Sequence, residues 1–301
     1  MTSQAPFSSA HLWLEERYAY DARARNRNLE KLVAADLKAF RFLRIVDLGA
    51  GLGANLRYYS DFFDCDQEWY CVEKDLALCE AFFPHLERWA FEQGWSCRRD
   101  SQLIILQKKK KTVTASLLPG SFIPFPTALA SIPLDLGLAN AVFDLVSGQQ
   151  FSFLAEALAS RAVPLLATLN YVSMRFVPSR IEDQRIIKLY DQTMTFPGPA
   201  GTPMGPRCAA VMKKILKESD YQVADGKSPW TISGDDGSLL HLLLQYVQTS
   251  VSAFRGEKIE IDDLEDWIRR KKEGVISGAV KLLVRHHDLY ARLPRGRASR
   301  L

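Results

Sequence analysis

Residues 43–55 read LRIVDLGAGLGAN. Apolar residues at positions 43, 45, 46 and 48 predict a short buried strand, and glycines follow at positions 49, 51 and 53. Glycine tolerates the positive φ of a sharp turn. It also lets a ligand approach the backbone, where free N–H groups at the start of the next helix can bind it. The stretch therefore predicts a strand, a glycine turn and a helix, which together open a nucleotide-type binding unit.

The length and composition are those of an ordinary soluble globular protein. The chain has 301 residues, of which 47% are hydrophobic and 25% charged, and its formal net charge is +4. That length allows one large domain or two small ones, and the mild positive charge does not by itself require a nucleic-acid partner. Because no composition shift marks a linker, we predict one domain. It comprises a helical cap over residues 1–40, a cofactor-binding half over residues 41–171, and a substrate-side half with a C-terminal hairpin over residues 172–301.

Cysteine spacing and the N-terminal sequence bear on metal binding and compartment. The five cysteines, at positions 65, 71, 79, 97 and 208, form no Cys-x-x-Cys pair and have no histidine nearby at zinc spacing. We therefore expect reduced thiols, no metal and a cytoplasmic protein. The first ten residues lack the basic start and apolar stretch of a signal peptide, and no run approaches the ~18 apolar residues of a membrane span. The sequence leaves the oligomeric state open.

Strand-like and helix-like segments alternate over the first 171 residues. This rhythm predicts an α/β fold with a mostly parallel sheet and helices on both faces. Predicted strands cover residues 43–48, 69–73, 102–107, 112–118, 134–138, 164–171, 221–232 and 281–292. Predicted helices cover residues 11–40 (one helix or a pair), 55–63, 76–93, 144–161, 181–193, 208–219, 237–254 and 262–274.

Two carboxylates frame the glycine turn. Asp47 ends the first predicted strand, and Glu73 ends the second. An acid at position 47 suits a ligand that carries an ammonium group and would repel a pyrophosphate, whereas a carboxylate at the tip of the second strand can accept hydrogen bonds from ribose hydroxyls. The turn also satisfies the loose dinucleotide pattern G-x-G-x-x-[GA]. An NAD-linked oxidoreductase and a turn without a ligand are therefore alternatives.

These motifs resemble those of class I S-adenosylmethionine-dependent methyltransferases. DLGAGLGAN at residues 47–55 and VEKD at residues 72–75 are similar to the first two motifs of that family. The resemblance extends to a poorly characterised bacterial group through WLEERYAYDARAR at residues 13–25, NAVFDLVS at residues 140–147 and RHHDLYARLP at residues 285–294. It implies a Rossmann-like, seven-stranded, mostly parallel sheet with an antiparallel last strand, and S-adenosyl-L-methionine as cofactor. Asn140 departs from the usual serine of that group.

The resemblance implies a set of site residues at the carboxyl ends of the strands. Those implied to bind the cofactor are Asp47, Gly49, Ala50, Gly51, Gly53, Asn55, Glu73, Lys74, Asn140 and Arg25. The catalytic candidates are Asn140, Asp144 and Tyr171. Asp144 is either the N-cap of the following helix or a base. Arg25 either meets the cofactor carboxylate or an acidic substrate, or lies on a solvated helix face.

The methyl acceptor stays open at the level of sequence. A small molecule is favoured because residues 172–206 and the N-terminal helices are long enough to form a lid. An RNA substrate is the first alternative, suggested by basic residues in a predicted hairpin and near the C-terminus: Lys108, Lys109, Lys110, Lys111, Arg292, Arg295, Arg297 and Arg300. The favoured explanation of the four lysines is a solvated loop or a turn that protects a sheet edge. A non-catalytic, cofactor-binding scaffold is the second alternative.

Overall fold

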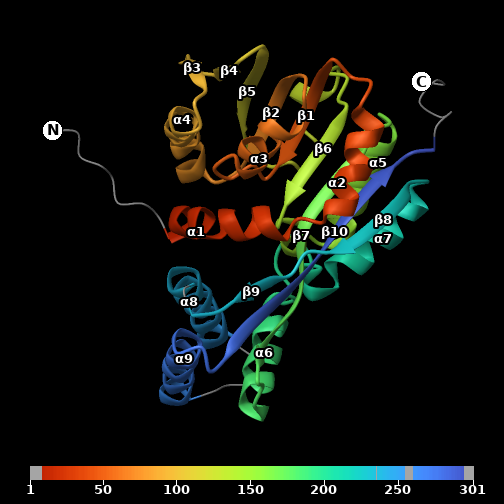
Figure 1. The fold of residues 1–301 in the computed structure, drawn as a ribbon. Helices are drawn as coiled ribbons and strands as arrows, with labels where there is room; N and C mark the ends of the chain where they lie inside the picture. Colours follow the sequence, from red (N-terminus) through yellow and green to blue (C-terminus); the bar gives the residue numbers. More distant parts are fainter. Residues whose placement is uncertain (1–8, 235, 255–259, 295–301) are drawn as a thin grey trace.

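A ten-stranded sheet forms the centre of the molecule (Figure 1). The structure, a computed structural model, describes residues 9–234, 236–254 and 260–294. Nine strands follow the order β3-β4-β5-β2-β1-β6-β7-β10-β8, and β9 pairs with β10. The strands are β1 (Phe42–Leu48), β2 (Asp66–Glu73), β3 (Ser96–Arg99), β4 (Leu103–Lys108), β5 (Lys111–Pro119), β6 (Leu136–Asn140), β7 (Leu165–Val177), β8 (Gln222–Lys227), β9 (Trp230–Ile232) and β10 (Lys281–Arg292).

Seven of these strands have the arrangement that the methyltransferase resemblance implied. β5, β2, β1, β6 and β7 are parallel neighbours, and β10 runs antiparallel between β7 and β8. The predicted Rossmann-like, mostly parallel sheet with an antiparallel last strand is therefore confirmed. The sheet has more than seven strands because β4 and β3 extend the β5 edge in antiparallel fashion and β9 adds a short pairing to β10.

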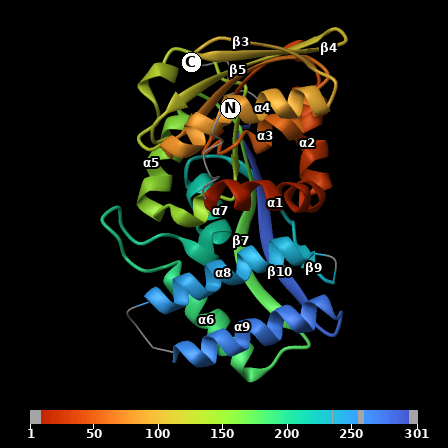
Figure 2. The same cartoon turned by 90° about the vertical axis from the view of Figure 1, so that its left-hand side faces the viewer.

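Helices cover both faces of the sheet, and further helices lie at one end of it (Figures 1 and 2). They are α1 (Ser9–Ala24), α2 (Arg27–Leu37), α3 (Ala54–Phe62), α4 (Leu76–Glu92), α5 (Gly148–Ala159), α6 (Ile181–Thr193), α7 (Cys208–Glu218), α8 (Gly237–Ala253) and α9 (Ile261–Ile276). Short 3₁₀ turns are η1 (Thr127–Leu129), η2 (Phe143–Leu145) and η3 (Gly205–Arg207).

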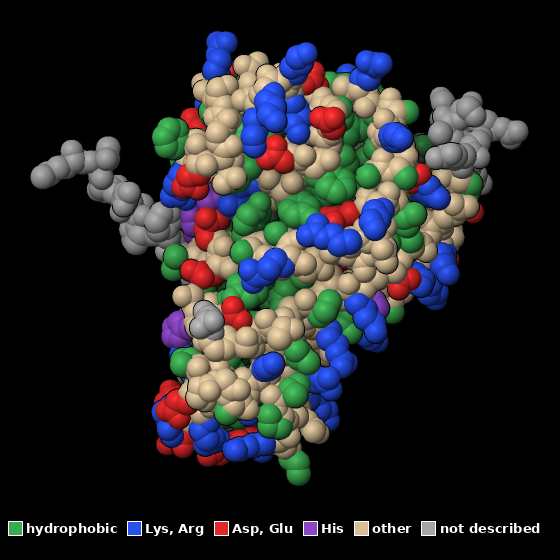
Figure 3. Space-filling view, viewed as in Figure 1, with side chains coloured by type: hydrophobic (Ala, Val, Ile, Leu, Met, Phe, Trp, Pro, Cys, Tyr) green, Lys and Arg blue, Asp and Glu red, His purple; other side chains and the backbone are tan. Residues whose placement is uncertain are grey.

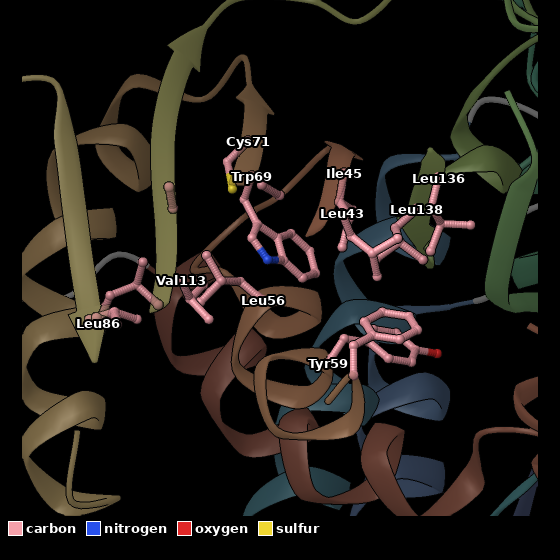
Figure 4. Close-up of a cluster of buried hydrophobic side chains, with 14 of the residues drawn as sticks. Leu43, Ile45, Leu56, Tyr59, Trp69, Cys71, Leu86, Val113, Leu136 and Leu138 are labelled. Atoms are coloured by element: carbon pink, nitrogen blue, oxygen red, sulfur yellow. The ribbon is translucent and has the colours of Figure 1, made fainter. Parts of the chain in front are cut away.

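The two-residue period of a strand divides the core between the two faces. Leu43 and Ile45 on β1 join a buried cluster with side chains of α2, α3 and α4. Figure 4 shows Trp69 of β2 among them. Val46 and Leu48 point to the opposite face and join a cluster with α5 and α7. Both faces of β1 are thus covered, which explains its almost continuous apolar sequence.

Strands β7 and β10 extend beyond the other strands of the sheet and carry a third hydrophobic cluster there. Their pairing runs from Leu165 and Ala291 at one end to Val177 and Lys281 at the other. The far part packs with α6, α8 and α9 around buried residues such as Trp267, and Figure 1 shows these helices at the end of the two long strands. The strand predicted over residues 164–171 is therefore longer than expected.

Two further local predictions differ from the structure, and one strand was not predicted. The strand predicted over residues 221–232 is split into β8 and β9 by Ser228 and Pro229. Pro229 has no backbone N–H to donate, and the Ser228 N–H donates to the carbonyl of His286. The helix predicted over residues 144–161 begins only at Gly148, after turn η2. Strand β3 was not predicted, because four residues with mostly exposed side chains give little periodicity.

Candidate functional site

A cavity of about 290 Å³ lies at the carboxyl ends of β1, β2 and β6. This edge, where the strand order reverses between β1 and β6, is where open α/β sheets bind ligands. Seven predicted cofactor-site residues line it: Gly49, Ala50, Gly51, Asn55, Glu73, Lys74 and Asn140. Asp47, Gly53 and Arg25 were also predicted and do not line it. Helix α1 supplies Leu14, Arg17 and Asp21 to the opposite wall.

The glycine turn needs its glycines for two separate reasons. Gly49, Gly51 and Gly53 have φ angles of 77°, 54° and 76°, which L side chains rarely adopt. A Cβ on Gly49 would lie 2.9 Å from Cγ2 of Val142, and a Cβ on Gly51 would lie 3.1 Å from Cδ1 of Leu14. The turn thus brings the backbone close to both neighbouring walls of the cavity.

Glu73 joins the end of β2 to the glycine turn. Its Oε2 accepts a hydrogen bond from the backbone N–H of Gly51 at 2.9 Å, and its Oε1 accepts one from the N–H of Asp75 at 2.8 Å. Asp75 in turn is the N-cap of α4, where its side chain accepts from Ala77 and Leu78. The buried Glu73 carboxylate therefore fixes the turn and presents its remaining lone pairs to the cavity.

Asp47 lies fully buried beneath the turn. Its Oδ1 accepts from Nδ2 of Asn55 at 2.7 Å, and its Oδ2 has no partner among the residues that the structure describes. Burial raises the pKa of Asp47 to about 7, against the opposing effects of the Asn55 hydrogen bond and the nearby Arg25 charge. A buried carboxylate with one unpartnered oxygen favours a cation or a hydrogen-bond donor beside it.

Arg25 lies behind the cavity wall rather than in it. Its Nη2 donates to Oδ1 of Asn55 at 2.9 Å, and its Nη1 donates to the hydroxyl of Tyr59 at 3.2 Å. The guanidinium also lies over the rings of Tyr58 and Tyr59. Arg25 therefore orients Asn55, which holds Asp47, and the solvated-face alternative is wrong because Arg25 is only 3% exposed.

Asn140 is tied to the N-terminal helix. Its Nδ2 donates to Oδ2 of Asp21 at 3.0 Å, and its Oδ1 accepts from the hydroxyl of Thr168 at 2.9 Å. Asp21 also forms a buried ion pair with Arg17, with Nε and Oδ2 3.0 Å apart. This network connects α1 to the end of β6 across the cavity.

Arg57 is a cavity residue that the sequence reasoning missed. It lies one turn into α3, beside the glycine turn, with its guanidinium over the ring of Tyr18 and Nη2 donating to Glu15 at 3.2 Å. Its Nε is buried and has no partner among the described residues. The signal was its position in the first turn of the helix after the glycines, where the helix dipole also favours anions.

A second cavity of about 360 Å³ adjoins the first. The two share Leu14, Arg17, Leu78, Ala141 and Leu145. Aromatic residues from distant parts of the chain line the second cavity: Trp13, Tyr171, Tyr190, Trp230, Tyr246 and His286. The structure therefore separates the candidate residues into a glycine-turn cavity, which contains Asn140, and an aromatic cavity, which contains Asp144 and Tyr171.

Asp144 is not the N-cap of α5. Ser147 caps that helix, its hydroxyl accepting from the N–H of Gln150 while the Gln150 side chain accepts from Ser147 in return. Asp144 instead lies in η2, only 8% exposed, with no partner for its Oδ1 among the described residues. Burial raises the pKa of Asp144 to about 6, and the nearby charge of Arg17 opposes that rise.

Tyr171 and His286 are each held by one hydrogen bond in the aromatic cavity. The Tyr171 hydroxyl donates to Oδ1 of Asp191 at 2.7 Å, and burial raises the pKa of Asp191 to about 6. Nδ1 of His286 lies 3.1 Å from the carbonyl oxygen of Ser228, which places the ring proton on Nδ1. Burial and the Arg17 charge lower the pKa of His286 to about 3, so its ring is neutral.

Two non-glycine residues with positive φ border the aromatic cavity. Ala141 has φ 52° at the end of β6, and Leu169 has φ 56° within β7. The N–H of Ala141 donates to the carbonyl of Thr168, and the N–H of Leu169 donates to the carboxylate of Asp288. Such conformations cost of order 1–3 kcal/mol each and concentrate at functional sites. Ala141 lies directly after β6 and lines both cavities, whereas Leu169 lines the aromatic cavity alone.

The basic residues of the predicted hairpin lie at the other end of the sheet. Lys108, Lys109, Lys110 and Lys111 line a groove with Lys38 and Arg41, next to the amino ends of β1 and β5. Lys and Arg side chains gather at this end in Figure 3. Asp61, Asp64 and Asp66 also line the groove, and Asp61 pairs with Lys108 at 3.0 Å. Arg295, Arg297 and Arg300 lie outside the described residues.

The described part of the chain shows neither a metal-binding cluster nor a membrane-spanning helix. Within residues 9–234, 236–254 and 260–294, no group of three or more His, Cys, Asp or Glu side chains is arranged to hold a metal ion. The cysteines are free. None of the helices in the described part of the chain has the length and apolar character needed to cross a bilayer.

Comparison with known proteins gives similarity at the level of structure. No family model matches the sequence, and no curated protein sequence matches it. Similar solved structures include the YcgJ protein of Bacillus subtilis (TM-score 0.47, 12% identity, 90% of this chain and 100% of that chain). They also include a candidate sarcosine dimethylglycine methyltransferase of Galdieria sulphuraria (0.48, 13%, 95% and 98%) and the cyclopropane synthase MmaA2 of Mycobacterium tuberculosis (0.46, 11%, 94% and 96%). At these values the likeness concerns the overall arrangement of the chain, so any function rests on the residues of the site.

Proposed function

We propose that this chain transfers a methyl group from S-adenosyl-L-methionine to a small-molecule acceptor. The observation that carries the proposal is the positive-φ glycine turn that buried Glu73 closes at the edge of the cavity, with the negative charge of the Asp47 carboxylate buried beneath it. An amino-acid-bearing nucleoside fits this combination because it presents an ammonium group and ribose hydroxyls together. A dinucleotide fits poorly because its pyrophosphate would lie beside the Glu73 carboxylate, which already accepts the Gly51 N–H of the turn.

The residues around the cavity suit the remaining parts of that ligand. Arg17 and Arg57 are cations on the cavity wall and suit the methionine carboxylate. Phe122 and Leu78 provide apolar surface for the adenine ring. When bound, S-adenosylmethionine supplies a methyl group on a positively charged sulfur, which is already a good leaving group. The chain's own task is then to orient the acceptor in line with the methyl carbon and to exclude water.

A small acceptor is favoured over RNA by the positions of the two regions involved. The basic groove lies at the amino ends of the strands, whereas the glycine-turn cavity lies at their carboxyl ends. Helix α1 roofs the glycine-turn cavity through Leu14, Arg17 and Asp21, and a covered cavity suits a small ligand better than a polymer.

Ligand binding to the purified protein tests the proposal. We expect S-adenosylhomocysteine to raise the thermal unfolding midpoint and NAD to leave it unchanged, because only a ligand of the folded state stabilises it. Stabilisation by NAD alone would overturn the proposal in favour of an oxidoreductase. Purified protein with excess absorbance at ~260 nm that nuclease removes would instead favour the RNA alternative.

A further inference from the structure

The segment between β6 and α5 separates the two cavities. Asn140 and Val142 face the glycine-turn cavity, Asp144 faces the aromatic cavity, and Ala141 lines both. A ligand in the aromatic cavity would therefore lie directly across this segment from a ligand on the glycine turn. This arrangement suits two substrates that must exchange a group.

Aromatic rings give the second cavity its character. Trp13 lies edge-on to Trp230 and Tyr246, with ring centroids 6.2 and 5.1 Å apart. Tyr171 contacts Tyr190 in a similar way, with the ring centroids 6.2 Å apart. The Arg17 guanidinium already lies over the rings of Trp13 and Trp230, so a second cation is disfavoured there. A neutral, planar ring is the ligand that such walls accommodate best.

Two buried polar atoms of this cavity have no partner among the described residues. They are Oδ1 of Asp144 and the Nε1–H of Trp230, on side chains of residues that are 8% and 3% exposed. One accepts a hydrogen bond and the other can only donate. Buried polar groups are normally paired, so both indicate a ligand that carries a polar group able to donate and to accept. A hydroxyl group meets both needs.

We propose that the aromatic cavity binds the methyl acceptor, that this acceptor is a neutral aromatic molecule with a ring hydroxyl, and that Asp144 accepts the hydroxyl proton. This inference rests on the proposed methyl transfer. In the step, the acceptor oxygen bonds to the methyl carbon as the carbon–sulfur bond breaks, and the electron pair of that bond stays on sulfur. The hydroxyl proton passes to the Asp144 carboxylate and later to solvent. The products are a methyl ether and S-adenosylhomocysteine.

Asp144 suits this role better than the other titratable groups near it. Asp191 already accepts a hydrogen bond from Tyr171, and His286, whose pKa is about 3, is a weak base. Arg17 from α1, Tyr190 from α6 and Cys208 from α7 are the other charged or titratable groups that interact with Asp144. Burial raises the pKa values of Tyr190 and Cys208, so both keep their protons at neutral pH, and the Arg17 guanidinium has no acceptor atom. The pKa of Asp144, about 6, lies near the value that favours a general base.

Binding of 2-naphthol to the full chain saturated with S-adenosylhomocysteine tests the acceptor class. We expect saturable quenching of tryptophan fluorescence, with an amplitude that Trp13→Phe and Trp230→Phe reduce. Trp89, on α4, lies outside the cavity, so Trp89→Phe should change the amplitude only by the share of the total fluorescence that Trp89 contributes. We expect decahydro-2-naphthol, which has the hydroxyl without the aromatic ring, to bind at least ~10-fold more weakly. No saturable binding of 2-naphthol, or equal binding of the two compounds, overturns the class of acceptor.

Methyl transfer to 2-naphthol, followed as 2-methoxynaphthalene, tests the base. We expect Asp144→Asn to lower the rate by ~10²–10⁴-fold with an S-adenosylhomocysteine affinity within about twofold of the wild type. Asp135→Asn, the same change at a partly buried carboxylate that lines neither cavity, should stay within about threefold of the wild-type rate. The wild-type rate should rise with pH through about 6, and this dependence should be lost in Asp144→Asn.

The outcomes separate this inference from the proposed function. Loss of S-adenosylhomocysteine binding in the wild type would overturn the methyltransferase proposal itself. Intact S-adenosylhomocysteine binding without any 2-methoxynaphthalene would overturn the hydroxyl acceptor alone. A normal rate in Asp144→Asn, whatever the rate of Asp135→Asn, would overturn the assignment of Asp144.

Discussion

The glycine-turn cavity and the aromatic cavity adjoin but are built from different parts of the chain. The first depends on backbone and acids that lie within residues 47–57 and 73–75, with α1 as a roof. The second depends on side chains spread from Trp13 to His286. A site made by backbone geometry tolerates few substitutions, whereas a site made by side chains can change its ligand through single replacements. The glycine-turn cavity is therefore suited to one fixed ligand, whereas the ligand of the aromatic cavity can change through substitution of its side chains.

Substitution of Gly49 should have the largest effect and should be confined to the first cavity. Gly49→Ala puts an L side chain at a φ of 77°, which is strained, and brings its Cβ to 2.9 Å from Cγ2 of Val142. We expect the affinity for S-adenosylhomocysteine, measured by calorimetry, to fall at least ~100-fold, which is about 3 kcal/mol. Gly94→Ala is the matched control, because Gly94 has φ 71° but no atom within 4 Å of an added Cβ. Equal loss of affinity in both variants would show that backbone strain alone is responsible.

The buried acids of the two cavities should differ in how they couple stability to pH. The pKa of Asp47 is raised from 3.8 to about 7, so the folded state binds this proton more tightly than the unfolded state. The contribution of Asp47 to the free energy of unfolding therefore falls as pH rises from about 4 to about 7. The fall amounts to about 2.5 kcal/mol between about pH 5 and about pH 7.5. Because asparagine does not titrate, we expect the free energy of unfolding of Asp47→Asn, relative to that of the wild type, to rise by that amount across this pH interval. Urea unfolding at each pH measures it.

Asp144→Asn is the comparison from the aromatic cavity. The pKa of Asp144 is raised from 3.8 to about 6. The free energy of unfolding of Asp144→Asn, relative to that of the wild type, should therefore rise about half as much between about pH 5 and about pH 7.5. Wild-type and Asp47→Asn stabilities that run parallel with pH would contradict the burial of an ionisable Asp47.

Removal of the Glu73 carboxylate should weaken ligand binding without abolishing it. Glu73→Ala removes the hydrogen bonds to the N–H groups of Gly51 and Asp75 and the acceptor oxygens that face the cavity. We expect a loss of about 1–2 kcal/mol in S-adenosylhomocysteine binding by calorimetry. Glu68→Ala, on the same strand but paired with Arg44 instead, should bind normally. Unchanged affinity in Glu73→Ala would remove Glu73 from the site.

The sequence revealed the first cavity far better than the second, for physical reasons. Glycines that need positive φ and acids at strand ends are local patterns, so the positions of Gly49 and Glu73 at the turn could be predicted. The parallel sheet followed from the alternation of strands and helices, and its antiparallel last strand from the family resemblance. The Ser-x-x-Gln pattern of Ser147 and Gln150 was also local, and reading it as a capping box would have excluded Asp144 as the N-cap. The aromatic cavity had no such signal, because only the packing of α1, α6, α8 and β10 brings its rings together.

A conservative change in the aromatic cavity should have the smallest effect on the first ligand. Trp230→Phe keeps an aromatic ring on β9 and removes an Nε1–H that has no partner among the described residues. Its ring contacts His286 and Trp13 and does not line the glycine-turn cavity. We therefore expect S-adenosylhomocysteine affinity by calorimetry within about twofold of the wild type, a change of about 0.4 kcal/mol or less. A larger loss would mean that Arg17, which lies over the Trp230 ring and lines both cavities, couples the two sites. A substitution in the aromatic cavity would then also change ligand binding in the glycine-turn cavity.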